Sequence, residues 1–296
     1  AGAEAHPPRA LLELLRRVRG HTLLLLLWGD SLTTPEAAYS DELAALNDKQ
    51  RSRVVWQLLG MLPAATAKTV VALPYGLVPR ALSDEDWQTL SRLTGLQRLT
   101  LKGPVQRRYS ARPGNPTVFS EKLGALTGLR HLIIENHPDL IALPDALFSL
   151  SDLQSLTLRY CGVKALPETW SGLQSLKTLH IEACFSLTVL PDGLRAVTTL
   201  ETVRIIDCWH VRSGGQALEG LSGLTELTIR QAGIYPTTLV GLRALERLEL
   251  VQCGIGARPG DVLPPGLTSL TALTVLTLGE MENIASLPPL PPTVNA

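Results

Sequence analysis

The sequence has few aromatic residues, no net charge and no long apolar run. The last two shortages each argue against a class of protein. Aromatic residues make up 4% of the 296 residues, and 27 Lys and Arg residues balance 27 Asp and Glu residues. Because binding to nucleic acid needs a basic surplus, we expect no nucleic-acid partner. No apolar run approaches the roughly 20 residues that span a bilayer, so we expect no membrane insertion.

Motifs of the common enzyme classes are also missing. The sequence contains no G-x-x-x-x-G-K-[ST], H-E-x-x-H or G-x-S-x-G motif, and no glycine-rich loop between a strand and a helix. Its six histidines are scattered, without the close pairing of metal ligands. We therefore predict no catalytic residue, no cofactor and no metal site in this chain.

One spacing of aliphatic residues, by contrast, recurs along most of the chain. Leu-x-x-Leu-x-x-Leu-x-Leu-x-x-Cys, with Val or Ile in place of some leucines, occurs three times between residues 150 and 208. The first two copies are followed by a return segment that ends in Leu-Pro, at Pro167 and Pro191. Five further copies begin at Leu93, Leu126, Leu221, Leu242 and Leu270. This pattern is the signature of the leucine-rich repeat.

Eight such copies predict an α/β fold, a leucine-rich repeat solenoid of horseshoe form. In each copy a short parallel strand lines the concave side, and short helices or irregular turns lie outside. A single unit does not bury its leucines, whereas stacked units bury them against one another. We expect residues 93–296 to form these repeats.

The sequence of residues 1–92 predicts an α-helical N-terminal cap, which is expected to cover the first coil of the solenoid. Apolar spacing predicts helices over 8–18 and from Thr34 or Ser40 to Leu62, and Ser83 begins a capping-box sequence. Two short strands are expected at 21–28 and 70–73, and both are candidate degenerate repeats.

All four cysteines occupy one position of the repeat. That position also holds His137, Ala232 and Met281, which indicates a packing role rather than a specific chemistry. Strands of neighbouring coils lie about 4.8 Å apart, so the thiols come close together. We favour buried free thiols over disulfides or a metal site, because the paired spacings of metal ligands are absent. The cysteines are Cys161, Cys184, Cys208 and Cys253.

Three segments interrupt the repeat period. About ten extra residues lie within 103–122, and they bring Arg107, Arg108, Tyr109 and Arg112. The segment 209–218 lacks Leu-Pro and carries two adjacent glycines, and 254–265 is long and rich in glycine and proline. Such segments are either binding loops or tolerated insertions, and both interpretations stay open.

The strand positions beside the inward aliphatics predict two columns on the concave face. The central column is Thr100, Ile133, Thr157, His180, Arg204, Thr228, Glu249 and Thr277. The second column is Lys102, Glu135, Arg159, Glu182, Ile206, Arg230, Val251 and Gly279.

These columns allow two interpretations. Charges of alternating sign indicate a solvated ladder of weak ion pairs. Aromatic and apolar groups mixed with arginine are instead typical of the centre of a protein interface, and we favour this second interpretation. The predicted binding residues are Arg159, Tyr160, His180, Glu182, Arg204, Ile206, Trp209 and Arg230.

The full wording L-x-x-L-x-x-L-x-L-x-x-C-x-x-L-x-x-L-P, clearest in 153–167 and 176–191, resembles two families. One is the repeat region of plant intracellular immune receptors. The other is the plant-like repeat domain of type III secreted effectors of plant-pathogenic bacteria, which in some effectors precedes a separate E3 ubiquitin ligase domain. Arginine outnumbers lysine 21 to 6, which indicates a GC-rich bacterial gene and favours the effectors.

The resemblance implies a protein-protein interaction module that acts in the host cytoplasm after bacterial secretion. Such a module binds a host protein, or recruits substrate for a ligase domain outside this sequence, and we expect a monomer. The alternatives are a ligand-sensing domain of a plant-type immune receptor and a purely structural or self-associating solenoid. Because the sequence shows neither an initiator Met nor a signal peptide, we expect it to be a fragment of a longer protein.

Overall fold

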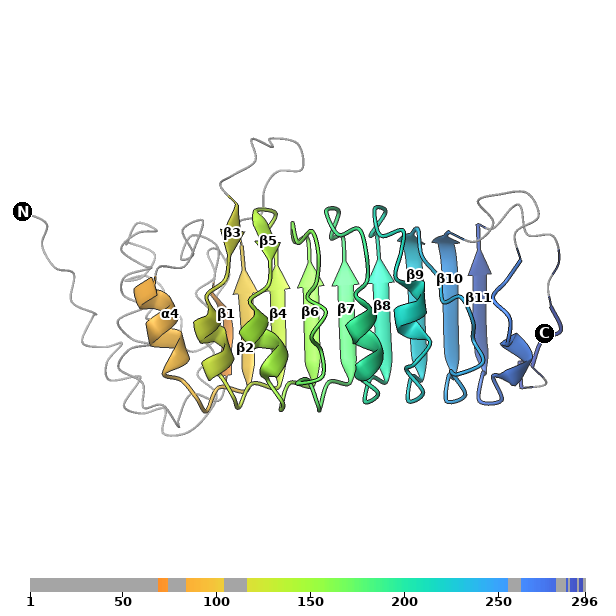
Figure 1. Cartoon of the computed structure of the whole chain (residues 1–296), viewed down its shortest axis with the longest axis horizontal. Coiled ribbons are helices and arrows are strands. Elements are labelled where there is room, and N and C mark those ends of the chain that lie inside the picture. Colours follow the sequence, from red (N-terminus) through yellow and green to blue (C-terminus); the bar gives the residue numbers. More distant parts are fainter. Residues whose placement is uncertain are drawn as a thin grey trace, which may run out of the picture.

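A parallel sheet of nine strands runs along the described part of the chain (Figure 1). The computed structural model describes residues 69–73, 84–103, 116–254, 262–280, 286, 288–291 and 293–294. Strand order in the sheet follows the sequence, so each coil lies between its sequence neighbours. The strands are β1 (Thr69–Leu73), β2 (Arg98–Lys102), β4 (His131–Glu135), β6 (Ser155–Arg159), β7 (Thr178–Glu182), β8 (Thr202–Ile206), β9 (Glu226–Ala232), β10 (Arg247–Cys253) and β11 (Val275–Gly279).

Each of the eight predicted repeats contributes one of these strands, which confirms the predicted solenoid. Equivalent positions of neighbouring repeats pair directly; Leu156 of β6, for example, pairs with Leu179 of β7, which pairs with Val203 of β8. The ninth strand, β1, covers the predicted strand 70–73 and pairs in parallel with β2. The repeat sheet therefore extends upstream of the first copy that the sequence pattern identifies.

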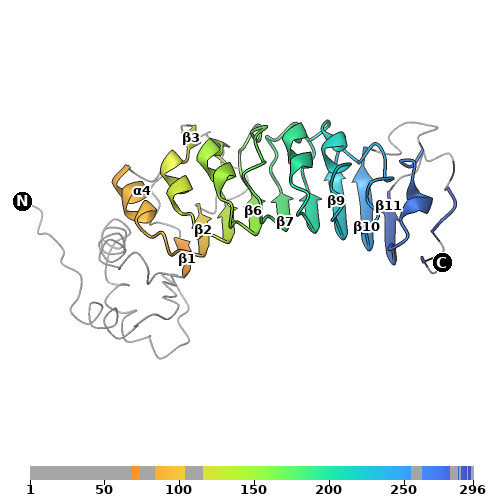
Figure 2. The same ribbon diagram turned by 60° about the horizontal axis from the view of Figure 1, so that its bottom comes forward.

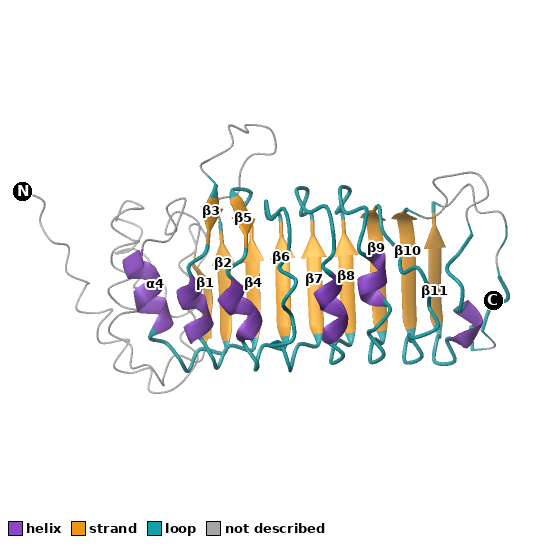
Figure 3. Ribbon diagram, viewed as in Figure 1, coloured by secondary structure: helices purple, strands orange, loops and turns teal. Residues whose placement is uncertain are grey.

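Short helices cover the other side of the sheet, as predicted for the outside of the solenoid (Figures 2 and 3). A small two-stranded sheet of β3 (Thr117–Val118) and β5 (Leu140–Ala142) lies within the return segments. Among the described residues, the helices other than the α-helix α4 (Asp84–Ser91) are 3₁₀ helices. They span Glu121–Ala125, Asp145–Ser149, Asp192–Ala196, Gly215–Leu218 and Leu267–Ser269.

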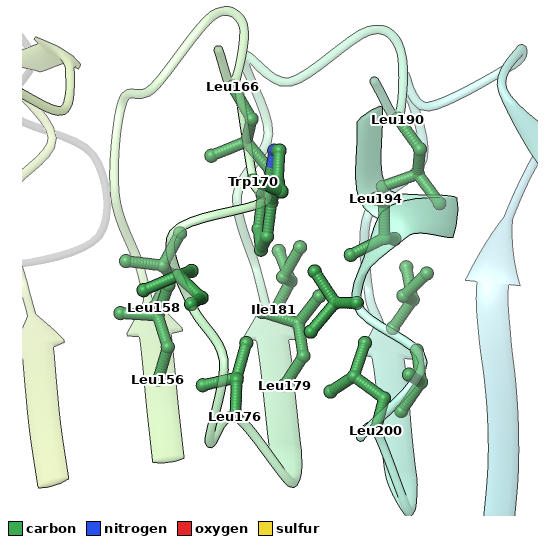
Figure 4. Packing of buried hydrophobic residues seen from close by; sticks show 14 of the residues in the cluster. Leu156, Leu158, Leu166, Trp170, Leu176, Leu179, Ile181, Leu190, Leu194 and Leu200 are labelled. Carbon is green, nitrogen blue, oxygen red and sulfur yellow. The ribbon is translucent and has the colours of Figure 1, made fainter. Parts of the chain in front are cut away.

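Stacked aliphatic side chains form the core between the two sides (Figure 4). Leu156, Leu179 and Ile181 point inward and are buried almost completely. Trp170 takes the place that leucine holds after the Leu-Pro of other coils, and it packs edge-on against Phe148 with ring centroids 4.8 Å apart. Its indole N–H donates to the Pro167 carbonyl at 2.7 Å, so the large ring is buried without an unsatisfied donor.

The helix predicted from the capping-box sequence is α4. Acidic residues fill its first turn, where they interact favourably with the helix dipole. Trp87 and Leu90 are buried, and the Trp87 ring lies 5.3 Å from that of Phe119. The two helices predicted before Pro63 and the strand predicted at 21–28 lie outside the described residues, as do Arg107, Arg108, Tyr109 and Arg112 of the inserted segment.

The cysteine column lies in the core, as predicted. All four cysteines are buried, and all four are thiols rather than members of a disulfide. The Cys161 thiol approaches the Arg159 carbonyl at 3.3 Å, and that of Cys208 approaches the Ile206 carbonyl at 3.3 Å. Burial raises the pKa of Cys208 to about 12, and the neighbouring Cys184 thiol adds to this shift. Since the pKa of Cys184 is raised as well, the Cys184 and Cys208 thiols stay protonated at neutral pH and lack the reactivity of a catalytic cysteine.

The structure explains why Gly214, the first of the two adjacent glycines, is a glycine. Gly214 precedes the 3₁₀ helix Gly215–Leu218 with φ at 93°, a left-handed conformation that glycine accepts readily. A Cβ atom at Gly214 would lie 2.2 Å from the carbonyl oxygen of Leu190 in the preceding coil. The glycine therefore permits both the turn and the close approach of two backbones.

Candidate functional site

The strand register confirms both predicted columns of the concave face. Thr157, His180, Arg204 and Thr228 are paired in sequence across β6 to β9. Two residues further along each strand, the second column is paired in the same way through Arg159, Glu182, Ile206 and Arg230. Six of the eight predicted binding residues therefore lie on one continuous patch of four neighbouring strands.

Glu182 lies at the centre of the first group of charges. Its carboxylate is 3.0 Å from Arg159 Nε and 3.3 Å from His180 Nε2. Neither nitrogen is aligned to donate a hydrogen bond, so the contacts are electrostatic. Burial lowers the pKa of His180, and Arg159 and Arg204 lower it further, against the opposite effect of Glu182. The ring is therefore neutral at pH 7.

Two more arginines form diagonal ion pairs. Arg204 donates from Nε at 3.1 Å and from Nη2 at 2.7 Å to one carboxylate oxygen of Glu226. Arg230 donates from Nε to Glu249 at 2.6 Å. The sequence columns did not predict these partners, because Glu226 belongs to neither column, and Arg230 and Glu249 belong to different columns on adjacent strands. Long side chains reach such diagonal neighbours, so the register of the strands is the signal that identifies them.

These pairs expose their cationic members more than their anionic members. The side chains of Arg159, Arg204 and Arg230 are 40% to 51% exposed, whereas those of Glu182, Glu226 and Glu249 are 22% to 26% exposed. A molecule that contacts this patch therefore meets guanidinium groups first, although the patch carries no net charge.

A sharp turn after each strand forms one edge of the concave face. Tyr160 and Ala183 are in the left-handed region, with φ at 52° for both, and five residues at equivalent positions share this conformation. The backbone N–H of Tyr160 donates to the carbonyl oxygen of Glu182 in the next coil, and that of Ala183 donates to the carbonyl oxygen of Ile206, each at 2.9 Å. These bonds extend the parallel ladder beyond the strands. The other five residues are Asn136, Asp207, Gln231, Gln252 and Glu280.

Three exposed aromatic side chains occupy this edge on three consecutive coils. Tyr160 follows β6, Phe185 follows β7 and Trp209 follows β8, with exposures between 41% and 54%. They are the exposed aromatic residues of the described part of the chain, and we call them the aromatic rim. Sequence reasoning missed Phe185, although it directly follows Cys184 as Trp209 follows Cys208.

The backbone that carries the rim is tied between coils. His210 Nδ1 lies 2.6 Å from the Phe185 carbonyl oxygen. Since a carbonyl oxygen only accepts, Nδ1 carries the proton and donates this bond. The bond joins the Phe185 and Trp209 turns directly.

Two kinds of feature are absent from the described residues. Among them no group of His, Cys, Asp and Glu is arranged to hold a metal ion. Nor does any helix within those ranges combine the length and the apolar character needed to cross a membrane. Exposed arginines beside exposed aromatics are the side chains that dominate binding energy in protein interfaces.

Comparison with known families identifies the repeat. Residues 115–234 match the family model described as leucine-rich repeat region, a non-catalytic interaction fold that implies protein-protein interaction. No curated protein matches the chain.

Solved structures that are similar to the chain include two leucine-rich repeat proteins and a receptor. A leucine-rich repeat protein of Leptospira interrogans is 18% identical, with 79% of this chain and 70% of that chain covered and a TM-score of 0.34. The leucine-rich repeat domain of the type III effector XopL is 21% identical, with 90% and 96% covered and a TM-score of 0.44. A TDR receptor is 19% identical, with 64% and 36% covered and a TM-score of 0.38.

Proposed function

We propose that this chain is the recognition module of a bacterial effector, and that it binds a host protein with the concave face of β6 to β9 and the aromatic rim. The observation that carries the proposal is that three exposed aromatic side chains follow three consecutive strands, β6, β7 and β8, two of which carry the exposed arginines Arg159 and Arg204. Elsewhere on the described surface, the exposed large apolar side chains are aliphatic. An aromatic and arginine cluster of this kind is the usual centre of an interface.

The ion-pair ladder alone does not account for this arrangement. Exposed ion pairs contribute about 0–1 kcal/mol each, so the ladder adds little to stability. It leaves the aromatic rim unexplained, because exposing a large apolar ring to water contributes nothing to folding. Binding explains both features with one surface.

The patch is small for a complete interface. Four strands at about 4.8 Å spacing span roughly 15 Å, whereas a standard interface buries about 800 Å² on each partner. Additional contacts beyond the four strands therefore complete the interface, and the aromatic rim lies next to the patch to supply some of them.

The effector role rests on the repeat wording and on the arginine-rich composition. The repeat pattern resembles both families, and the arginine-rich composition favours the effector over the immune receptor. An effector of this kind acts in the host cytoplasm after secretion. If a ligase domain is encoded alongside, this module selects its substrate. Incubating the chain alone with ubiquitin, E1 and E2 then yields no ubiquitin chains, and chain formation would contradict this division of roles.

Capture of proteins from plant extract tests the binding surface. The variant Tyr160→Ala plus Arg204→Ala should lose the captured partner and keep the melting temperature of the natural sequence, because both side chains point away from the core. A matched control is Val240→Ala plus Arg195→Ala, which removes one exposed apolar and one exposed arginine side chain from the return segments. If the first variant melts normally and captures the partner at full strength, the concave face is not the interface.

A further inference from the structure

We infer that the occupant of this surface is an acidic segment of a protein that carries aromatic or aliphatic anchors, and that Phe185 is one of the residues that bind it. This inference rests on the proposed function and adds the chemistry of the partner. It follows from the relative exposure of the charges, from the hydrogen-bond donors left on the arginines, and from the position of the rim.

The arginines retain donors for a second carboxylate. A guanidinium group has five N–H donors, and Arg204 directs Nε and Nη2 to a single oxygen of Glu226. Its remaining donors face away from that oxygen, on a side chain that is 44% exposed. A carboxylate from a partner adds to this guanidinium without breaking the existing pair, and Arg230 offers the same arrangement over Glu249.

A basic segment does not fit the same surface. To reach Glu182, Glu226 or Glu249, it has to displace the more exposed guanidinium that covers each carboxylate. Asp207, half-buried beside the rim, is the acidic exception. The exposed guanidinium groups thus favour a negatively charged partner, even though the patch is neutral as a whole. The preference acts when the two surfaces touch rather than through long-range attraction.

The aromatic rim provides the apolar part of the same surface. Tyr160 follows β6 and Trp209 follows β8, two coils further along, with Phe185 on the coil between them. Ile206, half-buried at the end of β8, adds an aliphatic group beside the rings. A partner segment of about five extended residues, at roughly 3.3 Å each, spans the distance from Arg159 to Arg230.

Three labelled peptides of about ten residues test the partner chemistry by fluorescence anisotropy. In the first, glutamate alternates with phenylalanine; in the second and third, lysine or glutamine replaces every glutamate. We expect the glutamate peptide to bind at least about 10-fold more tightly than either of the others. Phe185→Ala should weaken its binding about 10-fold without a change in melting temperature, as for a central aromatic residue of an interface.

A pair of charge-conserving variants separates guanidinium recognition from net charge. Arg204→Gln plus Glu226→Gln removes one cation and one anion from the patch, and it should reduce the preference for glutamate over glutamine. Lys177→Gln plus Glu201→Gln removes the exposed pair whose atoms lie 2.7 Å apart beside the starts of β7 and β8, and it should leave the preference unchanged.

The outcomes distinguish this inference from the proposed function. Equal binding of the three peptides, tighter binding of the lysine peptide, or no binding up to about 1 mM would overturn the acidic partner. Tighter binding of a thymidine oligonucleotide of equal charge would also overturn it, in favour of phosphate recognition. If host-protein capture still depends on Tyr160 and Arg204 in any of these cases, the proposed function stands without this partner chemistry.

Discussion

Replacing Gly214 with alanine tests how closely neighbouring coils pack. The backbone of Gly214 has φ at 93°, and a left-handed conformation costs a non-glycine residue about 1–2 kcal/mol. The added Cβ would also lie 2.2 Å from the oxygen and 2.7 Å from the nitrogen of Leu190. Because both are backbone atoms, the coils have to separate at this point.

That separation weakens the hydrogen bond from the Leu190 N–H to the Ser213 carbonyl, which is 3.1 Å long. Such a bond contributes about 1 kcal/mol, so the total loss of unfolding free energy should be about 3 kcal/mol. In a chain of this size, that loss lowers the melting temperature by roughly 6 °C.

Thermal unfolding followed by circular dichroism measures this loss, and Gly220→Ala is the matched control. Gly220 is exposed and has no positive φ, and its Cβ would lie 3.1 Å from the Cβ and 3.3 Å from the carbonyl oxygen of Arg195, without the overlap of backbone atoms found at Gly214. The control should therefore melt within about 1 °C of the natural sequence. Equal melting temperatures for the two variants would refute the close approach of the coils at Gly214.

Three further predictions concern the core. Leu179→Ala empties a fully buried position and should cost about 3–5 kcal/mol, measured by denaturant unfolding. A thiol reagent should find the four cysteines unreactive in the folded protein and all four reactive after denaturation without reductant; a count of two or none would contradict free buried thiols. Burial lowers the pKa of His137 from 6.5 to about 4, so the unfolded chain binds more protons between these values and stability should fall by about 3 kcal/mol as pH drops from 6.5 to 4. In His137→Leu this pH dependence should disappear.

The fold was predictable from the sequence because the repeat encodes it redundantly. Two inward aliphatics flank one outward residue in every strand, so Leu156 and Leu158 determine where Thr157 points. Eight copies of that alternation predicted the strands and both concave columns. β1 was predicted as a strand, but its pairing with β2 was not, because the segment 69–73 lacks the full repeat spacing.

The candidate site was predictable only in part. Arg159, His180, Arg204 and the other strand residues follow from the strand alternation. The pairing of Arg204 with Glu226 depends on register and side-chain reach, which no single strand encodes. Phe185 lies in a turn, where no alternation marks which side chains face water, and its exposure depends on how the chain leaves the sheet at Ala183.

Oxidative footprinting of a captured complex is the most direct test of the binding surface. Hydroxyl radicals modify exposed aromatic side chains, so the rates at Tyr160, Phe185 and Trp209 report whether a partner covers the rim. We predict that all three become protected in the complex, while Leu290, exposed near the end of the described chain, reacts as before. Unchanged rates at all three aromatic residues, with protection confined to the return segments, would contradict binding through the concave face and its rim.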